Sequence, residues 1–206
     1  MSEYRHTTKT HSKILLEIFA GLSVFFYIGL FFIYIFKRNE TIPFLTSLYI
    51  TDDYVTHLLV GLIIGGLGAV LASGICLITK TTVPETEGSD LLKRMMKTPS
   101  GIATISLGAG FFEEFFFRGV LIGLFVADVP AWILIIISSF LFWLVHVPQY
   151  KGRIILHAII FLLGLVFGLL FYWTGSLIAP MVAHAAYNVC ASIFFMKKGD
   201  GTSQNK

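Results

Sequence analysis

The sequence predicts an all-α integral membrane protein, a bundle of about six transmembrane helices, and three observations support this. Hydrophobic residues make up 56% of the 206 residues and charged residues only 13%, whereas about a quarter of the residues in a soluble domain are charged. The mean hydropathy of the chain is +0.81. Several apolar runs approach the ~20 residues that a helix needs to cross a bilayer. The lipid bilayer is therefore the expected environment.

Two apolar runs precede the polar middle of the chain. Ile14–Phe36 is too long for a signal-peptide core and lacks a small-residue cleavage site, so we expect a retained anchor. Val55–Thr79 is the second run, and Gly61 and Gly65 within it have the spacing that lets two helix backbones approach closely. The mildly apolar segment Thr41–Asp53 between the two runs is expected to lie along the membrane interface.

Four further spans follow Lys80–Thr98, which is the only sizeable polar connection. The third span carries three charged residues near its middle. The fourth is short, lies between Pro130 and Pro148, and has room to extend into its flanking turns. In chain order, the predicted spans are Ser100–Val126, Ala131–His146, Ile154–Trp173 and Leu177–Met196.

Basic residues predict the orientation, because cytoplasmic loops of membrane proteins carry an excess of Lys and Arg. Six spans place both terminal tails and the loops after spans two and four on one side. Only Lys37 and Arg38 lie in a connection on the other side. We therefore expect both termini in the cytoplasm. The small net charge of +3 is divided among these segments and does not indicate a nucleic-acid partner. The basic residues on the predicted cytoplasmic side are Arg5, Lys9, Lys13, Lys80, Lys93, Arg94, Lys97, Lys151, Arg153, Lys197, Lys198 and Lys206.

The stretch GFFEEFFFRG, residues 110–119, places three charges inside an aromatic run. An ionisable side chain at membrane depth costs at least about 2.5 kcal/mol and usually faces a partner or a watery cavity. Glu113 lies roughly 18 Å along its span, near the bilayer midplane. Glu114 and Arg118 are four residues apart and share a helix face, which allows an ion pair. Glu113 points about 100° away, and an apolar site raises the proton affinity of a free carboxylate, which suits a general base.

Two other spans carry polar side chains in similar positions. The fourth span ends in FWLVH, Phe142–His146, and the sixth contains HAAYN, His184–Asn188. In each motif the first and last residues lie about one helical turn apart on one face. Counted from the cytoplasmic end, His184 lies about as deep as Glu113, while His146 lies nearer the cytosol. Helix tilt or a longer fourth span would bring them level.

These groups suit the hydrolysis of an amide bond. A carboxylate with a histidine can take a proton from water, and a second histidine with an Asn amide can stabilise the oxyanion. The structural alternative is that Glu113, Glu114 and Arg118 only pair with one another and hold helices together. We expect His157, near the start of the fifth span, to be interfacial or structural. Ser176 suggests a serine protease, but it lacks the glycine-flanked context of a serine nucleophile.

The motifs EEFFFR, FWLVH and HAAYN resemble those of the CPBP family, the CAAX proteases and bacteriocin-processing enzymes, also called the Abi family. The resemblance covers residues 99–195, and the approach TGSLIAPMVAH to the last motif is similar as well. It implies a domain division with a tail, two transmembrane helices and a cytoplasmic loop in residues 1–98. The catalytic helical core would span residues 99–196, and residues 197–206 would form a polar tail.

The resemblance implies a glutamate-dependent intramembrane endopeptidase. Glu113 with His146 would activate water, and His184 with Asn188 would stabilise the oxyanion. Arg118 and Glu114 would hold the charged helix in place, and Glu114 would be available to assist directly. No cofactor is expected. Zinc is conceivable for a Glu/His/His set, but the sequence has no HExxH pair, so we expect metal-free chemistry.

The partners implied are a peptide or membrane-protein substrate and the lipid bilayer. A bacterial plasma membrane is the expected location, with peptide maturation or membrane-protein turnover preferred over prenyl-protein processing. The oligomeric state is open. Two alternatives to a protease remain at this point: a scaffold or immunity protein that keeps the fold without turnover, and a proton-coupled transporter. A transporter predicts inverted halves or broken helices, and neither is visible in the sequence.

Overall fold

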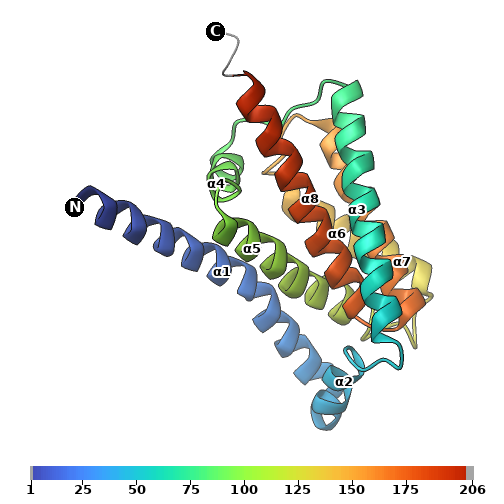
Figure 1. Cartoon of the computed structure of the whole chain (residues 1–206). Helices are drawn as coiled ribbons and strands as arrows, with labels where there is room; N and C mark the ends of the chain where they lie inside the picture. The colour runs from blue at the N-terminus through green and yellow to red at the C-terminus, as the bar shows by residue number, and fades with distance from the viewer. Residues whose placement is uncertain (1, 203–206) are drawn as a thin grey trace.

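Helices account for every regular element in the described part of the chain (Figure 1). The structure, a computed structural model, describes the backbone of residues 2–202 and the side chains of residues 11–86, 90 and 92–194. This confirms the all-α prediction for those residues. The elements are α1 (Ser2–Lys37), η1 (Arg38–Glu40), α2 (Thr41–Ser47), α3 (Tyr54–Ile78), α4 (Glu87–Met95), α5 (Pro99–Gly108), η2 (Ala109–Glu113), η3 (Phe115–Val120), α6 (Ala131–His146), α7 (Ile154–Thr174) and α8 (Ile178–Thr202).

Five of the predicted spans correspond to single α-helices, namely α1, α3, α6, α7 and α8. Three segments are long and apolar enough to cross a membrane by length and composition: His11–Ser47, Tyr54–Ile78 and Ile154–Thr174. Shorter apolar helices cover Ala131–His146 and Ile178–Phe194. The number of spans and the cytoplasmic placement of both termini stay predictions. The basic side chains expected in residues 1–10 and 197–206 lie outside the described side chains.

The third predicted span differs from a uniform α-helix. It begins with α5, where the Thr98 side chain accepts a hydrogen bond from the backbone N–H of Gly101 and Pro99 occupies the first turn. Both features favour a helix start. The α-helix then gives way to two π-helical segments, η2 and η3. The wider turn is visible in the hydrogen bond from Leu121 N to Phe116 O, at 3.0 Å, which spans five residues.

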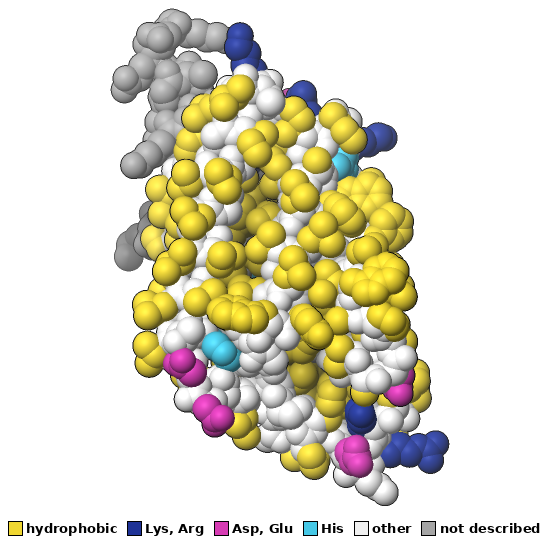
Figure 2. Space-filling model, turned by 90° about the vertical axis from the view of Figure 1, so that its right-hand side faces the viewer, with side chains coloured by type: hydrophobic (Ala, Val, Ile, Leu, Met, Phe, Trp, Pro, Cys, Tyr) yellow, Lys and Arg dark blue, Asp and Glu magenta, His cyan; other side chains and the backbone are white. Residues whose placement is uncertain are grey.

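Apolar side chains form much of the outer surface, as a lipid-facing surface requires. Figure 2 shows them over the middle of one face, with charged side chains gathered toward its two ends. On α3 alone, Leu62, Ile63 and Leu67 are each more than half exposed. A monomeric soluble protein rarely exposes so continuous an apolar surface. The arrangement supports a multi-pass membrane protein.

Helices α3 and α8 pack closely because glycines line their contact. A Cβ atom on Gly65 would lie 2.2 Å from the carbonyl oxygen of Ala183, and one on Gly61 would lie 2.7 Å from that of Ala179. Only residues without a side chain allow this approach. The close helix contact predicted from the glycine spacing is thus confirmed. It holds the part of α8 that carries His184 against α3.

The polar connection predicted at Lys80–Thr98 contains a short helix, α4. Met95 at its end is only 1% exposed, so α4 is anchored by its apolar side. The Thr86 hydroxyl donates a hydrogen bond to the backbone oxygen of Gln149 at 3.4 Å. This bond joins the connection to the turn that follows α6, and therefore to the segment just beyond His146.

Candidate active site

The helix that carries Glu113, Glu114 and Arg118 changes its winding where these residues occur. Glu113 ends η2, Glu114 separates the two π-helical segments, and Arg118 lies within η3. The Gly110 backbone lies so close to α8 that a Cβ there would come within 2.9 Å of the Met181 carbonyl oxygen. π-Helical turns are rare and often occur at functional sites. The wider turns and the close contact with α8 set the directions of the two adjacent carboxylates.

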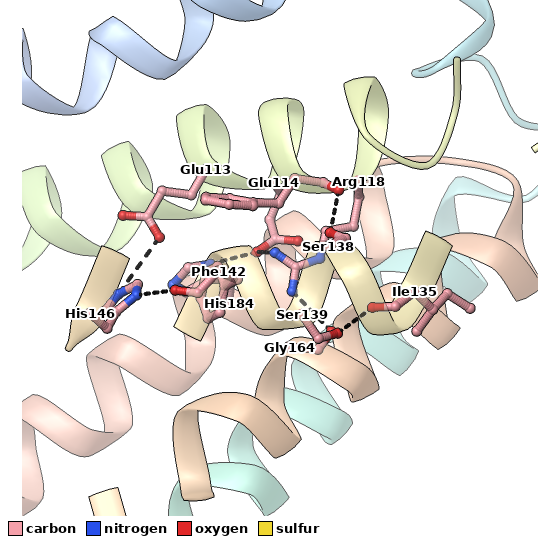
Figure 3. Close-up of polar contacts among 11 residues, drawn as sticks. Glu113, Glu114, Arg118, Ile135, Ser138, Ser139, Phe142, His146, Gly164 and His184 are labelled. Atoms are coloured by element: carbon pink, nitrogen blue, oxygen red, sulfur yellow. Dashed lines mark hydrogen bonds and ion pairs between the residues drawn. The ribbon is translucent and has the colours of Figure 1, made fainter. Parts of the chain in front are cut away.

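Glu114 is the centre of a buried polar network. Its Oε1 atom accepts hydrogen bonds from Nη1 of Arg118 at 3.0 Å and from Nδ1 of His184 at 2.7 Å. Both Glu114 and Arg118 are 0% exposed. Arg118 also donates from Nη2 to the backbone oxygen of Gly164 at 3.0 Å, and its guanidinium lies 4.6 Å from the centre of the Phe142 ring. The ion pair predicted from the four-residue spacing is therefore present, and it connects three helices (Figure 3).

Glu113 points away from this network and toward α6 (Figure 3). Its Oε2 atom lies 4.0 Å from Nε2 of His146. That oxygen is buried and has no hydrogen-bond partner among the described residues. A buried polar atom without a partner is costly, and this oxygen can accept a hydrogen bond from another molecule.

The hydrogen bond of His146 to its own helix defines which ring nitrogen faces Glu113. Nδ1 of His146 lies 2.7 Å from the carbonyl oxygen of Phe142. A carbonyl oxygen only accepts, so Nδ1 carries the hydrogen and donates it. In the neutral ring Nε2 is then an acceptor. A carboxylate oxygen and a ring nitrogen, both able to accept a hydrogen, thus face each other across the 4.0 Å gap.

His184 is held from two directions. Nδ1 donates to Glu114, while the ring stacks on Phe167 with centres 5.2 Å apart and meets the edge of Phe142 at 5.8 Å. The side chain is only 5% exposed. These contacts leave Nε2 as the nitrogen free to reach another group.

The sequence of this segment matches a family model. Residues 96–190 match the family described as "Rce1-like: Type II CAAX prenyl endopeptidase Rce1-like". The match covers 95 of the 206 residues, and it supports the resemblance to the CAAX protease family. This is a family of intramembrane endopeptidases, and the match includes all six predicted site residues. No curated protein and no solved structure matched the chain.

Asn188 is the predicted site residue that the structure leaves least connected. It follows His184 by one turn of α8 and is half-buried. Its backbone oxygen accepts a hydrogen bond from the Ser192 hydroxyl at 2.6 Å, and its side-chain amide makes no hydrogen bond to another described residue. The structure therefore pairs Glu113 with His146 and joins Glu114, Arg118 and His184, but it records no side-chain hydrogen bond between Asn188 and these five.

Two residues that support this candidate site escaped the sequence analysis. Ser138 on α6 is 1% exposed, and its hydroxyl donates to the carbonyl oxygen of Phe117 in η3 at 2.5 Å. Gly164 supplies the backbone oxygen that binds Arg118. The Ser138–Ser139 pair within an apolar run was the only available signal for the first. Nothing in the sequence indicated Gly164, because it binds Arg118 through its backbone oxygen, a group that every residue has.

Ser176 and His157, which the sequence analysis did not assign to the site, make contacts outside it. The Ser176 hydroxyl accepts a hydrogen bond from the backbone N–H of Ile178 at 3.2 Å, at the start of α8. The His157 ring meets the Trp143 ring at 6.0 Å. Among the described residues, no group of three or more His, Cys, Asp or Glu side chains is arranged to hold a metal ion.

Proposed function

We propose that this protein is an intramembrane endopeptidase that cleaves peptide bonds of membrane-associated peptides or proteins, with water activated by Glu113 and His146. One observation carries the proposal. Oε2 of Glu113 and Nε2 of His146 face each other at 4.0 Å, and the carboxylate oxygen has no other partner among the described residues. Two hydrogen bonds of about 2.8 Å each reach across such a gap, so one water molecule can bind both atoms.

In the proposed reaction the bound water donates one hydrogen to each partner. The Glu113 carboxylate takes a proton as the water oxygen attacks the carbonyl carbon of the scissile bond, which forms the tetrahedral intermediate. His146 orients the attacking oxygen, because Nδ1 fixes its ring against Phe142. The proton held by Glu113 then passes to the leaving amine as the C–N bond breaks. The carboxylate is regenerated.

The negative oxygen of the intermediate needs donors. We assign this role to His184 and Asn188, which lie one turn apart on α8. Because Nδ1 of His184 is engaged by Glu114, the donor is Nε2, which carries a hydrogen when the ring is doubly protonated. The Asn188 amide has two N–H donors that are not engaged by other described residues. Removal of one such donor typically lowers kcat by about 10²–10³-fold.

Glu114 and Arg118 position the other groups. Arg118 ties η3 to the Gly164 backbone, and Glu114 ties the same segment to His184. We propose metal-free chemistry in a bacterial plasma membrane, and peptide maturation or membrane-protein turnover in preference to prenyl-protein processing.

The test begins by finding a substrate. Membrane peptides are compared by mass spectrometry between cells that express the intact protein and cells that express the Glu113→Gln variant. A peptide bond cut only with the intact protein is then presented to the purified full chain in detergent. We expect cleavage by the wild type and a loss of at least about 100-fold in Glu113→Gln and His146→Ala.

Folding must be shown to be unchanged in both variants by thermal unfolding and circular dichroism. Glu85→Gln is the matched control, because Glu85 is exposed in the connection before α4 and its substitution should leave the rate unchanged. Cleavage at the wild-type rate by folded Glu113→Gln would overturn the proposed mechanism. A wild type that cuts no candidate peptide would instead favour a scaffold without turnover.

A further inference from the structure

A cavity lies between α3, α7, α8 and the turn that follows α6. Its lining is mainly apolar, with Ala72 and Ile160 among the contributors, but four polar side chains also line it: Ser73, Cys76, Tyr150 and Tyr187. The space open to the centre of a water-sized sphere is about 40 Å³. Since one water needs about 10–15 Å³ of such space, the cavity has room for roughly three.

The two tyrosines place this cavity one helical turn beyond the two histidines of the site. Tyr150 follows His146 by four residues, and its backbone N–H donates to the His146 carbonyl oxygen at 3.3 Å. Tyr187 follows His184 by three residues on α8 and lies next to Asn188 in the chain. The Tyr187 ring also packs against Gly68 of α3, where a Cβ would lie 3.6 Å away. The cavity thus lies one helical turn beyond the two histidines, toward the C-terminal ends of α3 and α8.

The hydroxyl groups around the cavity have unused hydrogen-bonding capacity. The Tyr150 oxygen accepts a hydrogen bond from the Gln149 amide at 3.1 Å, but its own hydrogen has no acceptor among the described residues. The hydroxyls of Ser73 and Tyr187 make no hydrogen bond to another described residue. Water occupies a buried cavity when it finds two to four polar partners there. Three hydroxyls around room for about three waters meet that condition.

Tyr150 also connects the cavity electrostatically with the proposed base. The side chain lies in the turn after α6, where burial, and to a lesser extent the Glu113 carboxylate, raises its pKa to about 12. The phenol therefore stays protonated over the pH range in which proteins work, so it can donate a hydrogen bond to water. Tyr150 follows His146 by one turn, so it binds such a water beyond the residue that faces the Glu113 carboxylate.

We propose that this cavity holds water and supplies it to Glu113 and His146, with Tyr150 and Tyr187 as the residues that position it. The inference rests on the proposed hydrolase function. A protease within a membrane consumes one water per bond cut, and hydrocarbon holds almost none. A local store one turn from the attacking position shortens the path of each new water.

Hydration can be tested without any cleavage assay. Hydroxyl radicals generated from water by brief X-ray irradiation label buried side chains only where water lies beside them. In the full chain in detergent we expect labelling of Tyr187 and Cys76, quantified by mass spectrometry. It should fall several-fold in Ala72→Leu, which fills the cavity. Absence of labelling in the wild type would overturn the proposal whatever the protein cleaves.

The supply role needs a second measurement. In the double variant Tyr150→Phe/Tyr187→Phe we expect kcat to fall about tenfold for each hydrogen bond lost, with KM unchanged. Tyr172→Phe is the control, because Tyr172 is 57% exposed on α7. An unchanged kcat in the double variant would overturn the supply role while leaving the protease intact.

The alternative occupant is a side chain of the substrate. In that case Ala72→Leu would raise KM and change which residue is accepted next to the cleaved bond, and this result would overturn the water assignment. If the wild type is labelled but cuts no peptide, the hydration of the cavity is supported and the proposed protease function fails. The two failures are therefore distinguishable.

Discussion

The Nδ1 atom of His184 lies 2.7 Å from Oε1 of Glu114, and the same oxygen accepts a hydrogen bond from Arg118 at 3.0 Å. One carboxylate oxygen therefore joins η3 to α8. Glu114 and Arg118 are fully buried, so each neutralises the other's charge, which would otherwise be unpaired in an apolar interior. The contacts of the three side chains are mutually dependent, and this dependence can be measured.

Removal of one partner of the buried pair should destabilise the fold more than removal of both. We expect Glu114→Gln and Arg118→Met each to lower the free energy of unfolding by about 3–5 kcal/mol, because each leaves an uncompensated charge. The double variant Glu114→Gln/Arg118→Met should recover part of that loss. Its cleavage activity should stay low, because His184 has lost its charged partner. Thermal unfolding in detergent measures the first effect and peptide cleavage the second.

An exposed ion pair provides the control. Lys13 and Glu17 approach to 3.9 Å, with side chains 78% and 63% exposed. Glu17→Gln should change the stability by less than about 1 kcal/mol, since such pairs contribute little. If the losses in Glu114→Gln and Arg118→Met simply added in the double variant, the two side chains would not be coupled as the structure indicates.

Ser138 should stabilise the π-helical segment that carries Arg118. Its hydroxyl donates to the Phe117 carbonyl oxygen at 2.5 Å, and Ser138→Ala leaves that buried oxygen without this donor. We expect a loss of about 1–3 kcal/mol in stability and a fall in kcat, since Glu113 precedes Phe117 by one turn. Ser138→Thr keeps the hydroxyl and should restore kcat.

The neighbouring Ser139 is a close control for this substitution. Its hydroxyl donates to Ile135 of the same helix at 2.6 Å, an oxygen that the helix backbone already engages. Ser139 is also fully buried, but Ser139→Ala leaves no carbonyl oxygen without a donor, so it should lower stability less than Ser138→Ala. Equal effects of the two alanine variants would contradict a special role for the contact with Phe117.

The sequence was sufficient for the parts of the fold that depend on local pattern. Apolar runs located α3, α6 and α7 within one residue at each end, whereas α1 begins 12 residues before the predicted Ile14 and α8 ends six residues after the predicted Met196. The four-residue spacing predicted the pairing of Glu114 with Arg118, because residues four apart share a helix face. The contact of α3 with another helix followed from the glycine spacing. These features need little knowledge of what packs against them.

The parts that the sequence left open depend on the packing of several helices. The π-helical winding of η2 and η3 has no local sequence signature. It depends on donors from other helices, such as the Ser138 hydroxyl of α6, which donates to the carbonyl oxygen of Phe117. The depth count along straight α-helices placed His146 nearer the cytosol than Glu113, yet the two lie 4.0 Å apart. That count assumed a uniform α-helical rise, whereas the third span contains π-helical turns. The environment of the Asn188 amide likewise depends on neighbours distant in sequence.

A methyl group added at Gly65 should weaken the packing of α3 against α8, whereas a methyl group added at Gly66 should not. Gly65→Ala places a Cβ 2.2 Å from the Ala183 carbonyl oxygen, so the helices must separate. We expect a loss of about 1–3 kcal/mol and reduced cleavage, because His184 follows Ala183. Gly66→Ala meets nothing within 4 Å and should be neutral or stabilising by up to about 1 kcal/mol. Thermal unfolding of both variants checks this, and equal effects would contradict the close contact.

Cleavage should not require a metal ion. Glu114 is bound by Arg118 and His184, and Nδ1 of His146 donates to a backbone oxygen. The described residues contain no group of three or more side chains arranged to hold a metal. We therefore expect the rate of cleavage to persist after treatment with 1,10-phenanthroline and dialysis. A known zinc protease treated in parallel controls for the chelator. Loss of activity with recovery on addition of Zn²⁺ would show that Glu113 and the histidines act on a bound metal, and the water-activation step would then have to be assigned to that ion.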